Sequence, residues 1–237
     1  MSSCQINDNG CTLLARTLCN NFSIRNIDLT DNHIGDAGMM ELAHMLGKNT
    51  TLQRLHLGGN DFGDDGLMEL ARALRTNKTL QSLIMGSENY GDKGIGCVMS
   101  VLTESNDTLR RLDLLRGKSW TVGLETVESI AKYLGSAKST CRDGSGLQHL
   151  DIHSFVIEED RMGLIAESLK RNKRLNEFNF SAGGLGIAGL ESIAEALRFN
   201  TVLQRMQYSG KHFGCNGLKN LGFDDDDDGD DDWGFNW

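Results

Sequence analysis

Three residues on one predicted strand carry the chemistry of metal ligands. His149, Asp151 and His153 alternate with other residues along a stretch that also holds Leu150 and Ile152, which places their side chains on one face of a strand. Imidazole and carboxylate groups are ligands that Zn²⁺ and related ions accept. Neighbours of this spacing stand roughly 7 Å apart, so only long side chains would converge on one ion. We interpret the three as a polar strand face and expect no metal site.

Two glycine-containing motifs have the spacing of nucleotide-binding sequences. Gly184, Gly186 and Gly189 match GxGxxG between a strand and a helix, but no acidic residue follows at the distance where a dinucleotide ribose would bind. Residues 117–119 read GKS after a strand, yet the first glycine of a P-loop would fall on Leu112, which belongs to an apolar pattern. Neither motif predicts a nucleotide site.

The aspartates near the end of the sequence resemble the opening of a calcium loop. Asp224, Asp226, Asp228 and Gly229 have the required spacing, but position twelve of the loop, which needs a bidentate glutamate, is Phe235. GxSxG, HExxH and Cys/His arrangements are absent from the sequence. We therefore expect no catalytic residue, no metal and no cofactor, and predict that the protein is not an enzyme.

Charge and composition limit the class of partner. The formal charge of the 237 residues is -9, but eight aspartates lie between Asp224 and Asp232, so the rest of the chain is nearly neutral. A nearly neutral body argues against nucleic acid as the partner, and no apolar run is long enough to span a membrane. The six cysteines form no CxxC pair, and the first residues lack a signal-peptide pattern. We predict a reduced cytoplasmic protein, with the nucleus as a second location.

The elements that must position these residues come from an internal repeat. Apolar residues at positions one, four and six of a strand-like stretch recur with spacings of 28, 28, 29, 38, 28 and 28 residues. The repeats begin at Ile24, Leu52, Leu80, Leu109, Leu147, Leu175 and Leu203. Within each repeat the apolar period changes from alternation to helical spacing, which predicts one strand followed by one helix. No repeat can bury its apolar face alone, so the repeats must stack into a parallel inner sheet with outer helices.

Two polar or small positions also recur. Asn32 and Asn60 follow their strands, where an asparagine side chain satisfies backbone groups of a turning chain. A glycine near each helix start lets the helix approach its neighbour, and we place it at Gly38, Gly66, Gly94, Gly123, Gly189 and Gly217. The spacing of 38 residues reflects a polar insertion before Leu147, which we expect to form a loop at the rim.

The pattern LxxLxLxxNxIGDxGxxxLAxxLxxN resembles the long leucine-rich repeat of the ribonuclease-inhibitor class. The resemblance implies an α/β solenoid, or horseshoe, of about seven strand–helix repeats over residues 1–223, followed by a disordered acidic tail with aromatic residues over 224–237. It also implies protein binding on the concave sheet and its adjoining loops. Members of this class include ribonuclease inhibitors, tropomodulin-like actin regulators and Ran GTPase-activating proteins.

The repeat register predicts a binding site on repeats four and five, because alternate strand residues point away from the apolar core. Charged, imidazole and aromatic side chains concentrate there, and interface hot spots favour tryptophan, tyrosine and arginine. The candidate partner-binding residues are Arg111, Asp113, Arg116, Trp120, His149, Asp151, His153 and Phe155.

The tail adds a second candidate element, with Trp233, Phe235 and Trp237 beside the aspartate run. It is typical of a solubilising segment, and it also resembles the Trp-acidic motifs of Wiskott-Aldrich-type factors and of kinesin light chain cargo. A third reading is that its aromatic residues cover the last repeat.

Our leading interpretation is a non-enzymatic scaffold that binds another protein of unknown identity. The alternatives are a regulator of a small GTPase resembling Ran GTPase-activating protein, and a cytoskeletal adaptor with a Trp-acidic tail motif.

Overall fold

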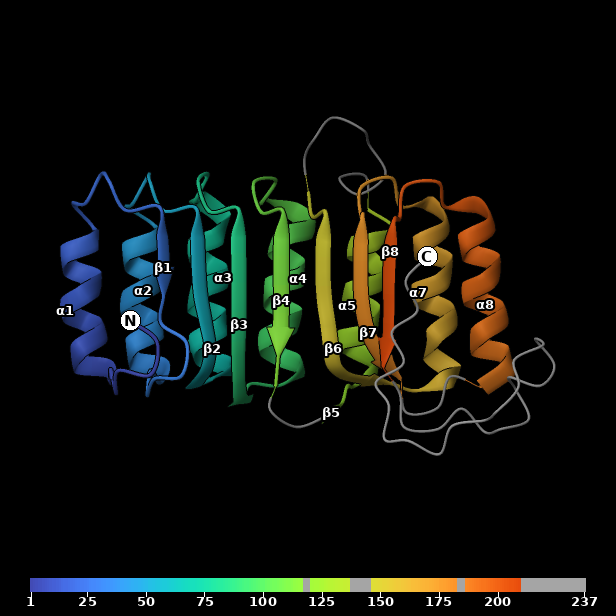
Figure 1. Ribbon diagram of the computed structural model, residues 1–237, viewed down its shortest axis with the longest axis horizontal. Helices are drawn as coiled ribbons and strands as arrows, with labels where there is room; N and C mark the ends of the chain where they lie inside the picture. The colour runs from blue at the N-terminus through green and yellow to red at the C-terminus, as the bar shows by residue number, and fades with distance from the viewer. Residues whose placement is uncertain (117–119, 137–145, 183–185, 210–237) are drawn as a thin grey trace.

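The computed structural model describes residues 1–116, 120–136, 146–182 and 186–209. Strands and helices alternate along the chain (Figure 1). In chain order the elements are α1 (Asp8–Leu18), β1 (Asn26–Asp28), α2 (Asp36–Leu46), β2 (Arg54–Gly63), α3 (Asp64–Thr76), β3 (Ser82–Asn89), α4 (Asp92–Glu104), β4 (Arg111–Leu115), β5 (Trp120–Thr121), α5 (Leu124–Leu134), β6 (His149–Ile157), α7 (Glu159–Arg171), β7 (Glu177–Ala182), α8 (Gly186–Phe199) and β8 (Arg205–Ser209).

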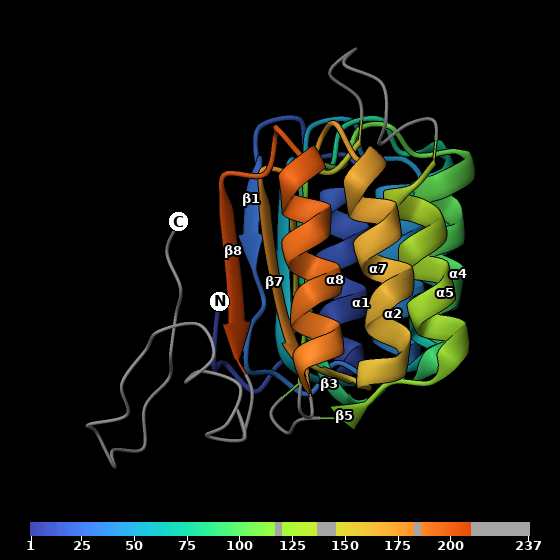
Figure 2. The ribbon, with the colours of Figure 1, turned by 90° about the vertical axis from the view of Figure 1, so that its right-hand side faces the viewer.

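The molecule has two layers. All the strands belong to one parallel sheet in the order β1-β2-β3-β4-β6-β7-β8, with β5 pairing to β6 beside this path. Within the described ranges, the helices cover one face of the sheet, and no helix covers the other, which we call the open face (Figure 2). In that view the central helices α4 and α5 lie farther from the open face than the terminal helices α1 and α8. The open face is therefore concave, as expected for a solenoid.

The repeat register is the same from strand to strand. Leu55 pairs with Leu83, and Leu83 pairs with Leu112. All three side chains are fully buried between the sheet and the helices. The neighbouring strand positions point to the open face, so the predicted alternation of core and concave residues is confirmed.

Buried asparagines join consecutive repeats. The Asn60 side chain donates to the carbonyls of Leu29 and Leu57 and accepts from the N–H of Ile34. This is the predicted role at the strand exit. A second set, which we did not predict, follows the helices, where the Asn77 side chain donates to the Leu46 carbonyl and accepts from its own turn. The same bonds recur at Asn49, Asn106, Asn172 and Asn200.

A relay of aspartates explains the recurring glycines. Asp64 Oδ1, at the start of α3, accepts from the backbone N–H groups of Gly91 (2.7 Å) and Gly94 (2.9 Å) at the start of α4. A Cβ at Gly94 would lie 2.6 Å from that oxygen and 2.9 Å from Leu67 Cδ1, so a side chain there would displace both. Asp8 and Asp36 bind their neighbouring repeats in the same way.

The glycine assignment in repeat four was wrong. Gly123 precedes α5 as its N-cap and is therefore equivalent to Gly91, not to Gly94. Its N–H donates to Asp92, and the hydroxyl of Thr126 donates to the same carboxylate. Thr126 thus replaces the glycine of the earlier repeats, because its hydroxyl takes over one of the bonds to the aspartate.

Several sequence predictions concern residues outside the described ranges. These are the GKS motif at 117–119, the insertion at 137–145, Gly184, Gly217 and the acidic tail at 224–237 with Trp233, Phe235 and Trp237. Among the described residues, no helix has both the length and the apolar character that a bilayer span requires. The cysteines of the described ranges, Cys4, Cys11, Cys19 and Cys97, are free thiols.

Candidate functional site

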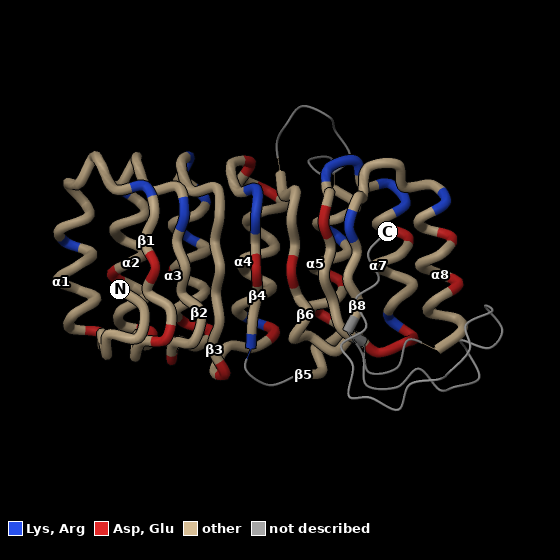
Figure 3. Tube along the Cα trace, viewed as in Figure 1, with Lys and Arg blue, Asp and Glu red and all other residues tan. Residues whose placement is uncertain are grey.

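Ion pairs link charged side chains on the concave face from β4 onward. Figure 3 shows charged residues on β4, β6, β7 and β8 and also on β1 and β2, but β3 between them carries Ser82 and Ile84 at the same register positions. The parallel register places two rows across β4, β6, β7 and β8. The first row is Arg111, His149, Glu177 and Arg205, and the second is Asp113, Asp151, Asn179 and Gln207. We call the side chains of Arg111, Asp113, His149, Asp151, Glu177, Asn179 and Arg205 the charged cluster.

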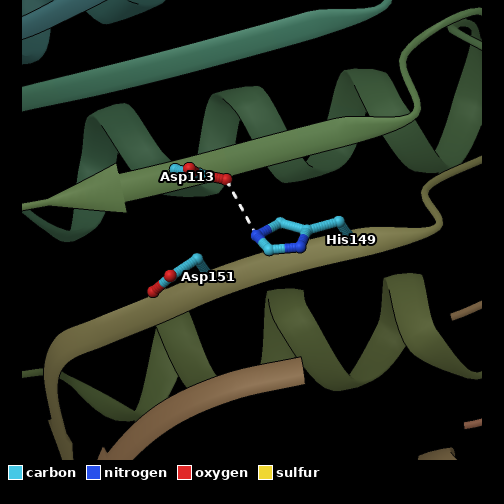
Figure 4. Close-up of side chains that lie close together, drawn as sticks. All are labelled: Asp113, His149 and Asp151. Carbon is cyan, nitrogen blue, oxygen red and sulfur yellow. Dashed lines mark ion pairs between the residues drawn. The ribbon is translucent and has the colours of Figure 1, made fainter. Parts of the chain in front are cut away.

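His149 lies at the centre of the charged cluster and is 9% exposed. Its Nδ1 lies 3.0 Å from Glu177 Oε2 on β7, and its Nε2 lies 3.2 Å from Asp113 Oδ1 on β4 (Figure 4). The first contact fits a hydrogen bond. The second is an ion-pair distance only, because the buried Nε2 has no hydrogen-bond partner.

The carboxylates shift the pKa of His149 upward. Burial by itself lowers the pKa of an imidazole, but pairing with Asp113 and Glu177 outweighs burial here. In return, the pKa of Glu177 falls below its usual value, because pairing with His149 and Arg205 outweighs the effect of burial. The cluster therefore stabilises the ionised form of Glu177 and keeps His149 protonated to a higher pH than a solvated imidazole.

The two aspartates are also held by neighbouring side chains. Arg111 Nη2 lies 2.6 Å from Asp113 Oδ2, and its Nε lies 3.0 Å from Oδ1, so the guanidinium binds the carboxylate through two nitrogens. Asn179 Nδ2 donates to Asp151 Oδ2 at 3.0 Å, and His153 Nδ1 lies 2.6 Å from Oδ1. Burial raises the pKa of Asp151, but these hydrogen bonds outweigh burial and lower it overall.

An aromatic shelf lies beside the charged cluster, where the strands end. We define the aromatic shelf as Tyr90, Arg116, Trp120 and Phe155. The Arg116 guanidinium stacks 4.8 Å from the ring centre of Trp120 and 5.6 Å from that of Tyr90. It also donates to the backbone carbonyls of Glu88 and Tyr90. Trp120 packs edge-on against Phe155 at 5.7 Å between ring centres. Trp120 is therefore held on two sides, with part of its ring accessible.

The structure separates the candidate residues by accessibility. Arg111 and His153 expose 44% and 51% of their side chains, and Trp120 is half-buried. Asp113, Asp151 and His149 are largely buried within the charged cluster. Arg116 exposes 12% of its side chain and holds the shelf together. Only the first three therefore offer substantial surface to a partner.

Phe155 was wrongly placed on the binding surface. It is fully buried in the core. Phe155 stands eight residues after Leu147, as Asn60 stands eight after Leu52, so it occupies the inward-pointing asparagine position of its repeat. Ser154 takes over part of the missing asparagine's role, because its hydroxyl bonds both the N–H and the carbonyl of Arg116.

Our sequence analysis did not include Glu177, Asn179, Arg205 and Tyr90 in the site. The signal for the first three was present, because the repeat register aligns them with His149 and Asp151 on the next strands. Tyr90 gave no comparable signal, since it stands at an apolar core position, and its hydroxyl reaches the Leu115 carbonyl at 2.6 Å.

The family comparison identifies the repeat seen in this architecture. The sequence model of the leucine-rich repeat matches residues 20–43 and 48–71. No curated protein sequence matches the chain significantly. Among solved structures, the leiomodin-1 actin-binding site 2 is similar at 16% identity and a TM-score of 0.46, over 78% of this chain and 87% of that one. The tropomodulin C-terminal domain of Caenorhabditis elegans is similar at 11% identity and a TM-score of 0.42, over 91% of this chain and 99% of that one.

The fold class follows from the repeat sequence and the structure together. Two repeats match the family model, and the same period continues to Leu203. Each repeat from Ile24 to Leu175 adds a strand to one parallel sheet and a helix on its outer side, and the last described repeat adds β8. The described residues therefore have the fold of a leucine-rich repeat solenoid.

Proposed function

We propose that this chain is a non-enzymatic scaffold that binds a protein partner through the concave face and strand-exit loops of repeats four and five. The observation that carries the proposal is Trp120, a partly exposed aromatic residue held by Arg116 on one side and Phe155 on the other. Tryptophan and arginine dominate the binding energy of protein interfaces. A ring already held in place loses little conformational entropy on binding, which favours affinity.

Two further exposed residues lie on the strands that lead to the shelf. Arg111 begins β4 and His153 lies on β6, and each exposes about half of its side chain. The carboxylates of the charged cluster are buried and paired, so these strands offer a partner a cationic group and an imidazole on the same face as the aromatic shelf. Acidic and apolar side chains of a partner fit this combination best.

Variants of the accessible residues test the proposal. Trp120→Ala and Arg111→Ala are expected to reduce partner capture from a lysate of the source cell at least roughly tenfold, the range for loss of one interface hot spot. Phe22→Ala and Arg54→Ala are matched controls, because Phe22 is 75% exposed and Arg54 is exposed at the Arg111 register position on β2. These controls should capture the same proteins as the unchanged chain.

Thermal unfolding of all four variants separates binding from stability. The proposal would be contradicted if all four variants lost partner capture equally. It would also be contradicted if capture fell only in variants whose Tm is lowered. A chain lacking residues 224–237 belongs in the same comparison. We expect it to retain the partner, and loss of the partner with the tail would move the binding element from the concave face to Trp233, Phe235 and Trp237.

Two narrower functions remain hypotheses from the sequence. A regulator of a small GTPase would accelerate single-turnover GTP hydrolysis by a Ran-type GTPase, and a cytoskeletal adaptor would cosediment with actin filaments. One similar structure carries actin binding in its name, but its likeness to this chain is too distant to favour the second hypothesis.

A further inference from the structure

We propose that Asp113, His149 and Asp151 form a binding site for a divalent transition-metal ion such as Zn²⁺ on the concave face. The three residues come from two adjacent strands, with Asp113 on β4 facing the other two on β6 (Figure 4). One ligand atom from each residue lies within 4.8 Å of the others. Our sequence analysis compared residues along one strand and missed this cluster, because pairing between strands creates it.

The distances suit one ion after a small movement. Ligand atoms around a tetrahedral Zn²⁺ stand about 3.4 Å apart, given metal–ligand distances of about 2.1 Å. Asp113 Oδ1 and His149 Nε2 already lie 3.2 Å apart. Asp151 must move its carboxylate inward by rotation of its side chain to complete the set. Two carboxylates and one imidazole leave a fourth position for water or for a side chain of a partner.

His149 provides the observation that points to a ligand. The residue is 9% exposed, and its Nε2 is buried without a hydrogen-bond partner while facing Asp113. Its Nδ1 contacts Glu177 at 3.0 Å. Metal-binding histidines share the Nδ1 contact, in which one nitrogen donates to a carboxylate and leaves the other nitrogen for the ion. Here that other nitrogen is Nε2, which faces the proposed ligand Asp113 at 3.2 Å. An ion at Nε2 would replace the proton that this nitrogen carries when the imidazole is charged.

The aspartates have similar support. Arg111 binds the Asp113 carboxylate, and Asn179 donates to Asp151 Oδ2. Bonds of this kind fix the orientation of metal ligands, and Asp113 is already in position. Asp151 must exchange its present bonds to His153 and Asn179 when its carboxylate rotates towards the ion. Asn179 is 7% exposed, and its Oδ1 is a second buried polar atom without a hydrogen-bond partner on this face.

Charge around the site permits a cation. Asp113, Asp151 and Glu177 place three carboxylates within the charged cluster, against the guanidinium groups of Arg111 and Arg205. The two arginine side chains are 44% and 59% exposed, and the three carboxylates are far more buried. Buried charges act more strongly on a buried ion than solvated charges do. The three carboxylates therefore make the electrostatic potential at the site favourable for a cation.

Oxygen and imidazole ligands together favour zinc and its first-row neighbours. Imidazole suits Zn²⁺, Cu²⁺, Ni²⁺ and Fe²⁺, whereas Mg²⁺ and Ca²⁺ prefer sites made of oxygen ligands alone. The cysteines of the described ranges are not part of this ligand set. Zinc bound here therefore has no thiolate ligand, and Co²⁺ in its place should show no thiolate charge-transfer absorption.

The test is calorimetric titration of ZnCl₂ into the chelator-treated full chain, without a partner. We expect one saturable site. His149→Gln, Asp113→Asn and Asp151→Asn should abolish it, and Glu177→Gln should weaken it roughly 10- to 100-fold by freeing the imidazole. His56→Gln is the matched control, because His56 is an imidazole on the same face of β2 and lies outside the ligand set.

The folding of each variant and its zinc affinity are measured in separate experiments. Circular dichroism and Tm in chelator establish that each variant is folded before titration, and Co²⁺ absorption reports the ligand type for any variant with a lowered Tm. Absence of a saturable site in the unchanged chain, a site retained in all three ligand variants, or thiolate absorption with Co²⁺ would overturn the proposal. Each of these results leaves partner binding through Trp120 untouched, because no partner is present in the experiment.

Discussion

Phe155 and Trp120 show how two neighbouring aromatic side chains take different roles. Phe155 occupies an inward position and is fully buried, whereas Trp120 lies on the adjacent β5 strand with part of its ring accessible. Their rings meet edge to face, so the core residue supports the surface residue. Truncation of Phe155 should therefore lower the free energy of unfolding more than a change at Trp120 does.

We expect Phe155→Ala to lower the free energy of unfolding by about 3–5 kcal/mol, the range for large-to-small substitutions in a core. Urea denaturation of the full chain measures this loss. Trp120→Phe serves as the control, since it keeps an aromatic ring on the shelf and should change the free energy of unfolding by much less. A loss below about 1 kcal/mol in Phe155→Ala would show that the side chain lies at the surface, as the sequence analysis assumed.

The error at Phe155 has a physical cause. The repeat spacing already marked its position as the buried asparagine of other repeats, but a change from asparagine to phenylalanine is ambiguous in a sequence. A phenylalanine at this position could bind a partner at the surface or pack into the core. It can pack into the core only if another group forms the backbone hydrogen bonds of the missing asparagine. Here the Ser154 hydroxyl forms hydrogen bonds with the backbone N–H and carbonyl of Arg116.

At the scale of elements, the sequence predicted most of the fold. The period placed strands and helices correctly, since apolar spacing alone determines which face of each element is buried. The asparagines at the strand exits were predicted together with their role. The Asp–Gly relay and the second asparagine set were not, because each bond joins one repeat to the next and becomes apparent only when the helices are in place.

The relay makes Asp64 a capping residue for the following helix. Its carboxylate accepts from two N–H groups at the start of α4, so Asp64→Ala should lower the free energy of unfolding by about 1–2 kcal/mol, the usual range for loss of an N-terminal cap. Chemical denaturation is the measurement. The control is Asp65→Ala, which removes an exposed carboxylate from the same turn of α3. Equal effects of the two substitutions would show that the loss reflects charge near the α3 start and not the relay.

The candidate site was predicted only in part, for the same reason. Arg111, Asp113, His149, Asp151 and His153 alternate with core residues as expected, because alternation is a local property, whereas Phe155, also on β6, is buried. The pairing of His149 with Asp113 and Glu177 depends on three strands in register and on side-chain rotamers, which no single repeat encodes. The inserted residues before Leu147 further obscured the alignment of repeats four and five.

At the scale of the whole molecule, the concave face has two unlike parts. β1 and β2 carry charged residues, but β3 has Ser82 and Ile84 at the concave register positions and separates them from the ion-paired charged cluster on β4, β6, β7 and β8 (Figure 3). The aromatic shelf lies beyond the end of β4. The stacked repeats hold both parts in fixed positions relative to each other, since each repeat is bonded to its neighbours by asparagine and aspartate side chains. A curved and preformed surface of this kind favours binding of one protein along several strands.

The central claim is that a partner binds the face formed by β4, β5 and β6. Hydroxyl-radical footprinting of the full chain, alone and with a captured partner, tests it most directly, because it reports side-chain accessibility at each residue. We predict protection of Trp120, Arg111 and His153, with no change at Met40 and Leu164 on the outer helices α2 and α7. Protection of Met40 and Leu164 with Trp120 unchanged would contradict the claim and place the partner on the helical side.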